Sequence, residues 1–111
     1  MWSYFFTYAS PVFGGALRST HALEIPFVFD NLDRGGAEML TGHGSDRQPI
    51  ADAMHRAWIA FAREGDPNHA GLPQWPQYDL DQRATMRFDT ECEVLFDPGR
   101  VDREAYGPVA L

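Results

Sequence analysis

The sequence has 111 residues, enough for one small domain, and a formal net charge of −7. Its 44% hydrophobic and 23% charged residues are typical of a globular protein. The acidic balance disfavours binding to nucleic acid and to anionic membrane surfaces, because both require basic patches. The single cysteine, Cys92, excludes an internal disulfide, and no apolar run approaches the roughly 20 residues of a membrane-spanning helix.

The first predicted element is a strand over Trp2–Tyr8, a run of β-favouring or neutral residues without a breaker. It does not alternate, because Phe5 is large and apolar on the face opposite Tyr4 and Phe6. Strands that are apolar on both faces belong in sheets covered on both sides, which are usually parallel α/β sheets. The rest of the sequence offers few neighbours for such a strand, so we expect this segment to belong to a larger sheet.

A loop is predicted over residues 9–20, which contain a proline and two adjacent glycines. His21 follows this loop directly. Residues 22–29 are predicted to form a short helix or a mixed turn, because Pro26 is tolerated only in the first turn of a helix. A polar, glycine-rich loop is expected to continue to Ser45.

Pro49–Glu64 is predicted to be a long amphipathic helix. Its apolar residues recur at three- and four-residue spacing and define one face: Ile50, Met54, Ala57, Trp58 and Phe61. Pro49 suits the first turn, and Gly65 is expected to end the helix.

The remaining segments are short. An irregular loop is expected over 66–73, followed by an extended segment over 75–78. Two strands, Ala84–Phe88 and Glu93–Phe96, are predicted to form an antiparallel hairpin. Residues 101–111 show a weak helical pattern that is expected to fray.

His21 and Glu24 are the residues that carry a candidate chemistry. His21 stands between a loop and a block of apolar residues, which places it at the edge of an interior, and imidazole can move protons near neutral pH. The alternative readings are an ordinary loop histidine and a carboxylate at the start of a helix. His43 and His69 lie in glycine- and proline-rich loops and are expected to be solvated. A zinc site formed by His21, Glu24 and His43 has no standard spacing, and no cofactor is indicated.

The segment from His21 to Phe29 resembles the catalytic-histidine segment of the type B carboxylesterases, the family of para-nitrobenzyl esterases and cholinesterases. The family motif reads His-Ala/Gly-x-Glu-Leu/Ile-x-Phe/Tyr-Val/Ile-Phe, and this segment fits every fixed position. Three further segments match the family in the same order, namely Trp58–Asn68 (Trp-x-x-Phe-Ala-x-x-Gly-Asp-Pro-Asn), Trp75–Tyr78 (Trp-Pro-x-Tyr) and Thr85–Phe88 (the closing strand). Together these landmarks cover about residues 2–97 and resemble the C-terminal region of the family.

The resemblance implies an α/β-hydrolase fold, of which residues 1–111 supply the C-terminal fifth or quarter. This part has one core strand, a histidine loop, a long amphipathic helix and a terminal antiparallel strand pair, and it is expected to be incomplete on its own. The family cleaves carboxylic esters with a Ser-His-Glu/Asp triad. His21 matches the family's catalytic histidine, and Glu24 its nearby supporting carboxylate rather than the triad acid. Phe27 and Phe29 are candidates for the wall of the substrate pocket.

The sequence departs from the family in one decisive respect, because it contains no Gly-x-Ser-x-Gly nucleophile elbow. The loop that carries the triad acid in the family also has no counterpart here. We therefore expect no significant esterase activity from the chain alone, which is interpreted as a truncated product or one piece of a split enzyme. Its expected partners are a small ester substrate in the full-length enzyme and the missing N-terminal part of the hydrolase. The alternative is a non-catalytic interaction module derived from a carboxylesterase-like domain.

Overall fold

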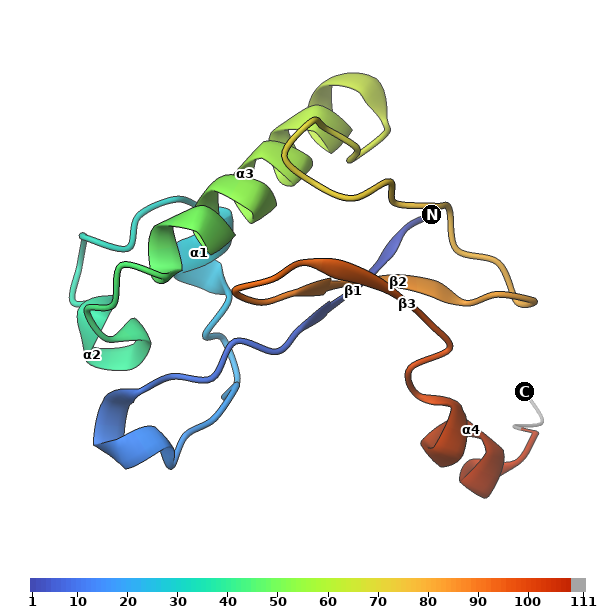
Figure 1. Cartoon of the computed structure of the whole chain (residues 1–111), viewed down its shortest axis with the longest axis horizontal. Coiled ribbons are helices and arrows are strands. Elements are labelled where there is room, and N and C mark those ends of the chain that lie inside the picture. Colours follow the sequence, from blue (N-terminus) through green and yellow to red (C-terminus); the bar gives the residue numbers. More distant parts are fainter. Residues whose placement is uncertain (109–111) are drawn as a thin grey trace.

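The computed structural model describes residues 1–108, which contain a three-stranded sheet in the order β1-β2-β3. β1 (Ser3–Phe6) pairs in parallel with β2 (Ala84–Phe88), and β2 pairs antiparallel with β3 (Glu93–Phe96) (Figure 1). The prediction of a mixed α/β fragment with one core strand and a terminal antiparallel pair is therefore confirmed. β1 is shorter than predicted, and within residues 1–108 it has a neighbouring strand on one edge only.

The core lies between the sheet and the helices α1 (Ile25–Val28) and α3 (Arg47–Glu64). Its largest fully buried side chains come from β2, α1, α3 and the segments beside them: Phe27, Phe88, Leu23, Ile50, Met54, Met86, Thr41 and Ser10. Aromatic rings link the layers, since Phe6 of β1 lies 5.3 Å from Phe27 of α1 and Trp75 lies 5.6 Å from Phe88 of β2, between ring centroids. The loop after β1 thus begins beside a well-packed interior.

The long helix is confirmed, with a start two residues earlier than predicted. Pro49 lies in its first turn, and Gly65 ends it with φ 74° while its N–H donates to the carbonyl of Phe61 at 2.8 Å. Ile50, Met54 and Ala57 are buried as the spacing predicts, whereas Phe61 is 52% exposed, so the apolar stripe extends past the surface that the sheet covers. Among the helices of residues 1–108, none combines the length and the hydrophobicity that a membrane-spanning segment requires.

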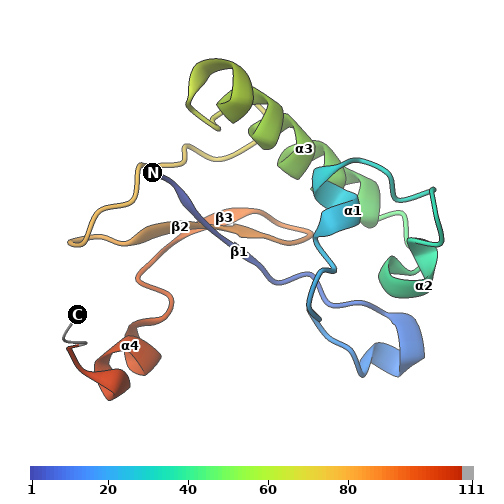
Figure 2. The same ribbon diagram turned by 180° about the vertical axis from the view of Figure 1, so that it is seen from behind.

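The short elements were harder to predict. The loop after β1 contains a 3₁₀ turn, η1 (Val12–Gly15), and the predicted loop before α3 contains a short helix, α2 (Glu38–Thr41). The weak C-terminal pattern forms α4 (Arg100–Tyr106), none of whose residues is buried. The fraying predicted for residues 109–111 lies outside the described residues. α1, α2 and η1 gather at one end of the sheet, away from α4 (Figure 2).

Candidate functional site

His21 is brought back to the carboxyl end of β1 because the loop before it is closed at its base. The Ser10 N–H donates to the Arg18 carbonyl at 3.0 Å, and the Ser19 hydroxyl donates to the Tyr8 carbonyl at 2.5 Å. Tyr8 and Ser10 are buried, so the closure is anchored in the core. The loop therefore returns to its starting point immediately before His21.

His21 itself lies in a turn on the surface. The Leu23 N–H donates to the Thr20 carbonyl at 3.2 Å, and Ala22 has a φ of 67°. A positive φ at the third position is the hallmark of a type II turn, and it favours glycine. The imidazole is exposed, and the histidine rings that make polar contacts in residues 1–108 are those of His43, His55 and His69. The turn thus presents the His21 ring outward.

Glu24 is half-buried directly before α1, and its side chain makes no capping hydrogen bond to that helix. Burial raises the pKa of Tyr4 above its usual value, and the negative charge of Glu24 raises it further. Glu24 and Tyr4 also line the same groove. The alternative reading of Glu24 as a carboxylate that caps the helix is not supported.

An open groove of about 450 Å³ runs between β1, α1 and α3. Its lining residues are mainly apolar and include Tyr4, Glu24, Phe29 and Trp58. Phe29 is 66% exposed, whereas Phe27 is fully buried in the core and has no surface to offer to a ligand in this structure. The assignment of both rings to a substrate pocket remains a prediction.

His55 fixes the position of the groove wall. Its Nδ1 lies 2.7 Å from the Val28 carbonyl, so a protonated Nδ1 joins α3 to the end of α1. His69, which was expected to be solvated, is half-buried instead. Its Nε2 lies 2.9 Å from the Ala53 carbonyl and its Nδ1 accepts from the Gly71 N–H at 3.1 Å, so the loop after α3 folds back on that helix.

The hydroxyls of Ser3, Ser10 and Ser19 form hydrogen bonds with the backbone or with a neighbouring strand. Ser10 donates to the Leu40 carbonyl and accepts from the Val12 N–H at 3.2 Å. Ser3 accepts from the Thr85 hydroxyl at 3.4 Å on the sheet, where two strands meet. Residues 1–108 contain no group of three histidine, cysteine or acidic side chains that could hold a metal ion.

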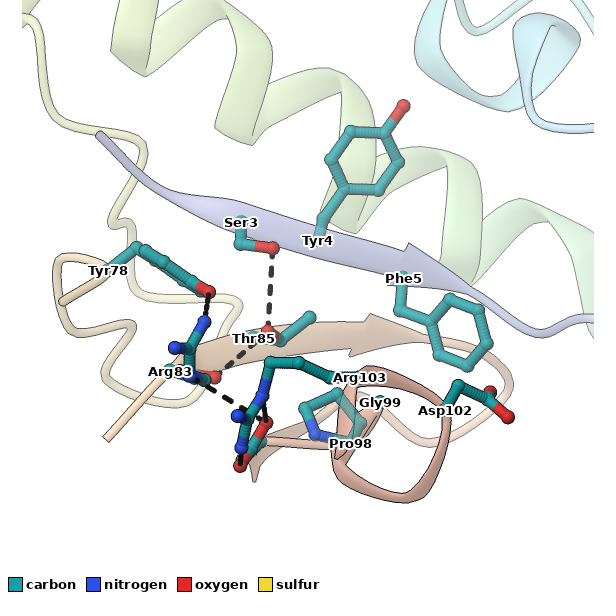
Figure 3. Close-up of a pocket in the computed structure, with 11 residues that line it drawn as sticks. Ser3, Tyr4, Phe5, Tyr78, Arg83, Thr85, Pro98, Gly99, Asp102 and Arg103 are labelled. Atoms are coloured by element: carbon teal, nitrogen blue, oxygen red, sulfur yellow. Dashed lines mark hydrogen bonds and ion pairs between the residues drawn. The ribbon is translucent and has the colours of Figure 1, made fainter. Parts of the chain in front are cut away.

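A polar cluster that the sequence did not indicate lies between β1 and α4 (Figure 3). Arg103 donates to Asp97 at 2.5 and 3.3 Å, and Arg83 lies 4.0 Å from the same carboxylate while it donates to the Tyr78 hydroxyl at 3.0 Å. The hydrogen bond from Arg103 lowers the pKa of Asp97 below its usual value. The arginines are already paired, so this cluster ties α4 to the end of the sheet.

Known proteins resemble this chain over most of its length, in sequence and in fold. The model of the carboxylesterase family matches residues 1–104. The chain is 41% identical over 103 residues to phenmedipham hydrolase of Pseudarthrobacter oxydans, covering 90% of this chain and 21% of that protein. It is 35% identical over 92 residues to para-nitrobenzyl esterase of Bacillus subtilis, covering 82% of this chain and 18% of that protein.

Solved carboxylesterase structures show the same similarity in fold. A carboxylesterase of Geobacillus stearothermophilus, EST55, superposes on this chain with a TM-score of 0.80 at 42% sequence identity. The match covers 95% of this chain and 21% of the EST55 chain. A para-nitrobenzyl esterase superposes with a TM-score of 0.83 at 32% sequence identity, and the match covers 97% of this chain and 22% of the esterase chain. The chain therefore belongs to the carboxylesterase family, as the motifs in its sequence indicate. It spans about one fifth of the length of these relatives.

Proposed function

We propose that residues 1–111 are the C-terminal part of a carboxylic-ester hydrolase and that His21 is its general base. The single observation that carries this proposal is the turn that returns the chain to the carboxyl end of β1 and presents the imidazole outward. In sheets with parallel strands, reacting groups gather beyond the carboxyl ends of the strands. An exposed ring at that edge is available to a nucleophile that another part of the fold supplies.

In this proposal His21 takes the proton of a serine hydroxyl as the serine attacks the ester carbonyl, and later gives the proton to the leaving alcohol. The serine and the triad acid come from the remaining part of the hydrolase. Glu24 supports the site near Tyr4 through hydrogen bonds made once the fold is complete, and Phe29 contributes apolar wall. The substrates are small carboxylic esters.

The isolated chain is expected to hydrolyse para-nitrophenyl acetate no faster than an equal concentration of free imidazole, because it has no nucleophile elbow. In a chimera of the Bacillus para-nitrobenzyl esterase whose matching segment is replaced by this chain, His21→Ala should lower kcat at least about 1,000-fold. His43→Gln, at an exposed histidine outside the groove, is the matched histidine control and should retain most of the activity. An isolated chain that turns over well above imidazole, or a chimera unaffected by His21→Ala, contradicts the proposal.

The second candidate, a non-catalytic interaction module, is favoured by the absence of a nucleophile elbow and by exposed aromatic side chains such as Phe5, Phe13 and Phe29. A module of this kind has to be stable by itself. Circular dichroism melting of the isolated chain distinguishes the two, since a cooperative and reversible transition supports a self-standing module.

A further inference from the structure

The carboxyl ends of β1 and β2 are joined by a side-chain hydrogen bond as well as by the backbone. The Thr7 hydroxyl donates to Oδ2 of Asp89 at 2.6 Å, and the Thr7 N–H donates to the Phe88 carbonyl at 3.0 Å. The other carboxylate oxygen of Asp89 accepts from the Thr90 N–H at 2.7 Å. A hydroxyl-to-carboxylate bond of this length belongs to the strong, charge-assisted class. Thr7 is therefore held to β2 by both its backbone and its side chain.

Tyr8, the next residue, is fixed from the opposite side by the core. It is buried, and its ring centroid lies 5.3 Å from that of Phe27 in α1. Its hydroxyl donates to the carbonyl of Thr41 in α2 at 3.4 Å. Residues 7 and 8 thus form a short stretch of backbone that β2 holds on one side and the short helices hold on the other.

The His21 turn is attached to this stretch of backbone. The Ser19 hydroxyl donates to the Tyr8 carbonyl at 2.5 Å, and the Thr20 carbonyl then accepts the Leu23 N–H that closes the turn. Within residues 1–108 the histidine rings with polar partners are those of other histidines. The position of the His21 imidazole therefore depends on the backbone of its turn.

We infer that Asp89 is a positioning residue for His21. Its carboxylate holds Thr7, Thr7 fixes the Tyr8 carbonyl, and that carbonyl holds Ser19 at the start of the turn. The catalytic consequence rests on the proposed function, whereas the effect on the turn does not. Proton transfer requires the ring to lie within hydrogen-bond reach of the nucleophile, and a displacement of about 1 Å can lower the rate about 100-fold.

Asp89 also has a local role, because its bond to the Thr90 N–H shapes the connection between β2 and β3. Thr7→Val separates the two roles, since it removes the hydroxyl, nearly conserves the shape of the side chain and leaves the Asp89–Thr90 bond in place. Thr7→Ser keeps the hydroxyl. Thr85→Val is the matched control, because the Thr85 hydroxyl donates to that of Ser3 at 3.4 Å across the opposite end of the same two strands.

Amide hydrogen exchange of the 111-residue chain, followed by NMR, tests the effect on the turn. We expect the Leu23 N–H to exchange at least about threefold faster in Thr7→Val and in Ser19→Ala than in the wild type, because each variant loses one supporting hydrogen bond. Thr7→Ser and Thr85→Val should stay within about twofold of the wild-type rate. Equal rates for the two valine variants overturn the inference.

The chimera with Bacillus para-nitrobenzyl esterase tests the catalytic consequence. Thr7→Val should lower kcat about tenfold or more and leave KM within about twofold, whereas Thr7→Ser and Thr85→Val retain most of kcat. Thr7→Val combined with Ser19→Ala should lower kcat about as much as the more damaging single variant, because both changes break one path. A double variant whose loss is the product of the two single losses overturns the inference.

His21→Ala separates this inference from the proposed function. Faster exchange at Leu23 in Thr7→Val, together with a chimera whose activity is unaffected by His21→Ala, contradicts the proposed function and supports the attachment of the turn. A chimera that requires His21 but responds alike to Thr7→Val and Thr85→Val supports the proposed function and overturns the inference.

Circular dichroism melts show whether each variant folds. If Thr7→Val does not fold, Asp89→Ala, which removes the acceptor instead of the donor, takes its place with the same expected results. If the chain does not melt cooperatively by itself, exchange is measured on the chimera by mass spectrometry of the peptide that contains the turn. A chain that folds neither alone nor in the chimera overturns the inference.

Discussion

Ala22 holds a left-handed backbone conformation, φ 67°, directly beside the candidate base. For a residue with a Cβ this conformation costs about 1–2 kcal/mol, and glycine avoids that cost. The motif of the family accepts alanine or glycine at this position, and the turn geometry gives the physical reason. The His21 turn therefore holds backbone strain directly beside the residue that we propose as the general base.

We expect Ala22→Gly to leave the free energy of unfolding unchanged or to raise it by up to about 1 kcal/mol, because relief of the strain is offset by the greater freedom of glycine in the unfolded chain. Ala22→Val, which is β-branched, should lower it by at least about 1 kcal/mol. Urea denaturation of the three proteins measures both changes. A glycine variant less stable than the valine variant would contradict this account of the turn.

Residue types and their spacing singled out His21 and Glu24 as candidates, and they placed Cys92, which is half-buried with a pKa raised mainly by burial. They could not predict which of the two rings, Phe27 or Phe29, is buried. Both fall in the same apolar block, and only the packing of α1 against the sheet decides that one ring is buried while the other lines a groove. His69 was misjudged because its partner, the Ala53 carbonyl, lies 16 residues away.

At the scale of elements, α3 was predictable because its apolar period, its first-turn proline and its terminal glycine all agree. α2 was not predictable, because a four-residue helix between glycines is too short to show a helical periodicity of apolar residues. α4 has no buried residue, so its position depends on the Asp97 carboxylate rather than on apolar packing.

The ion pair of Asp97 makes the attachment of α4 dependent on pH. The pKa of Asp97 in the folded chain lies below its ordinary value of 3.8, chiefly because Arg103 donates a hydrogen bond to the carboxylate. Because the pKa of Asp97 is lower in the folded chain, its ionised carboxylate stabilises the fold at pH values above 3.8. This stabilisation is lost as the pH falls from 3.8 through the folded pKa.

Asp97→Asn should therefore lower Tm at pH 6 and leave it nearly unchanged below the folded pKa of Asp97, where the wild-type carboxyl is already protonated. Thermal melts at both pH values provide the measurement, with Asp81→Asn, an exposed residue, as the control. A Tm difference that persists at the lower pH would show that the ion pair is not the cause.

At the scale of the whole molecule, the small core is concentrated around β2. Phe88 is fully buried, and its ring centroid lies 5.6 Å from that of Trp75 and 6.2 Å from that of Trp58. Phe88→Ala is expected to cost about 3–5 kcal/mol, a large share of the stability of a small domain. Leu80→Ala, at a residue 73% exposed, should change the free energy of unfolding by less than about 0.5 kcal/mol. Denaturant titrations compare the two, and similar losses would mean that β2 is not the centre of the core.

The sequence indicated that the first strand belongs in a parallel sheet, but it gave no reason to choose β2 as its neighbour. Parallel pairing leaves no local signal, because the partners are separated by most of the chain and no turn connects them. The hairpin of β2 and β3 was predictable for the opposite reason, since a short connection fixes it.

The pairing of Ser3 with Thr85 also sets the order of events during synthesis. A ribosome makes β1 well before β2, so the aromatic side chains of β1 lack this neighbouring strand until Ala84–Phe88 has been synthesised. Contacts this distant in sequence form slowly, whereas the β2–β3 hairpin closes within microseconds. The aromatic side chains of β1 therefore lack the cover of β2 and favour aggregation in the interval before Phe88 leaves the exit tunnel.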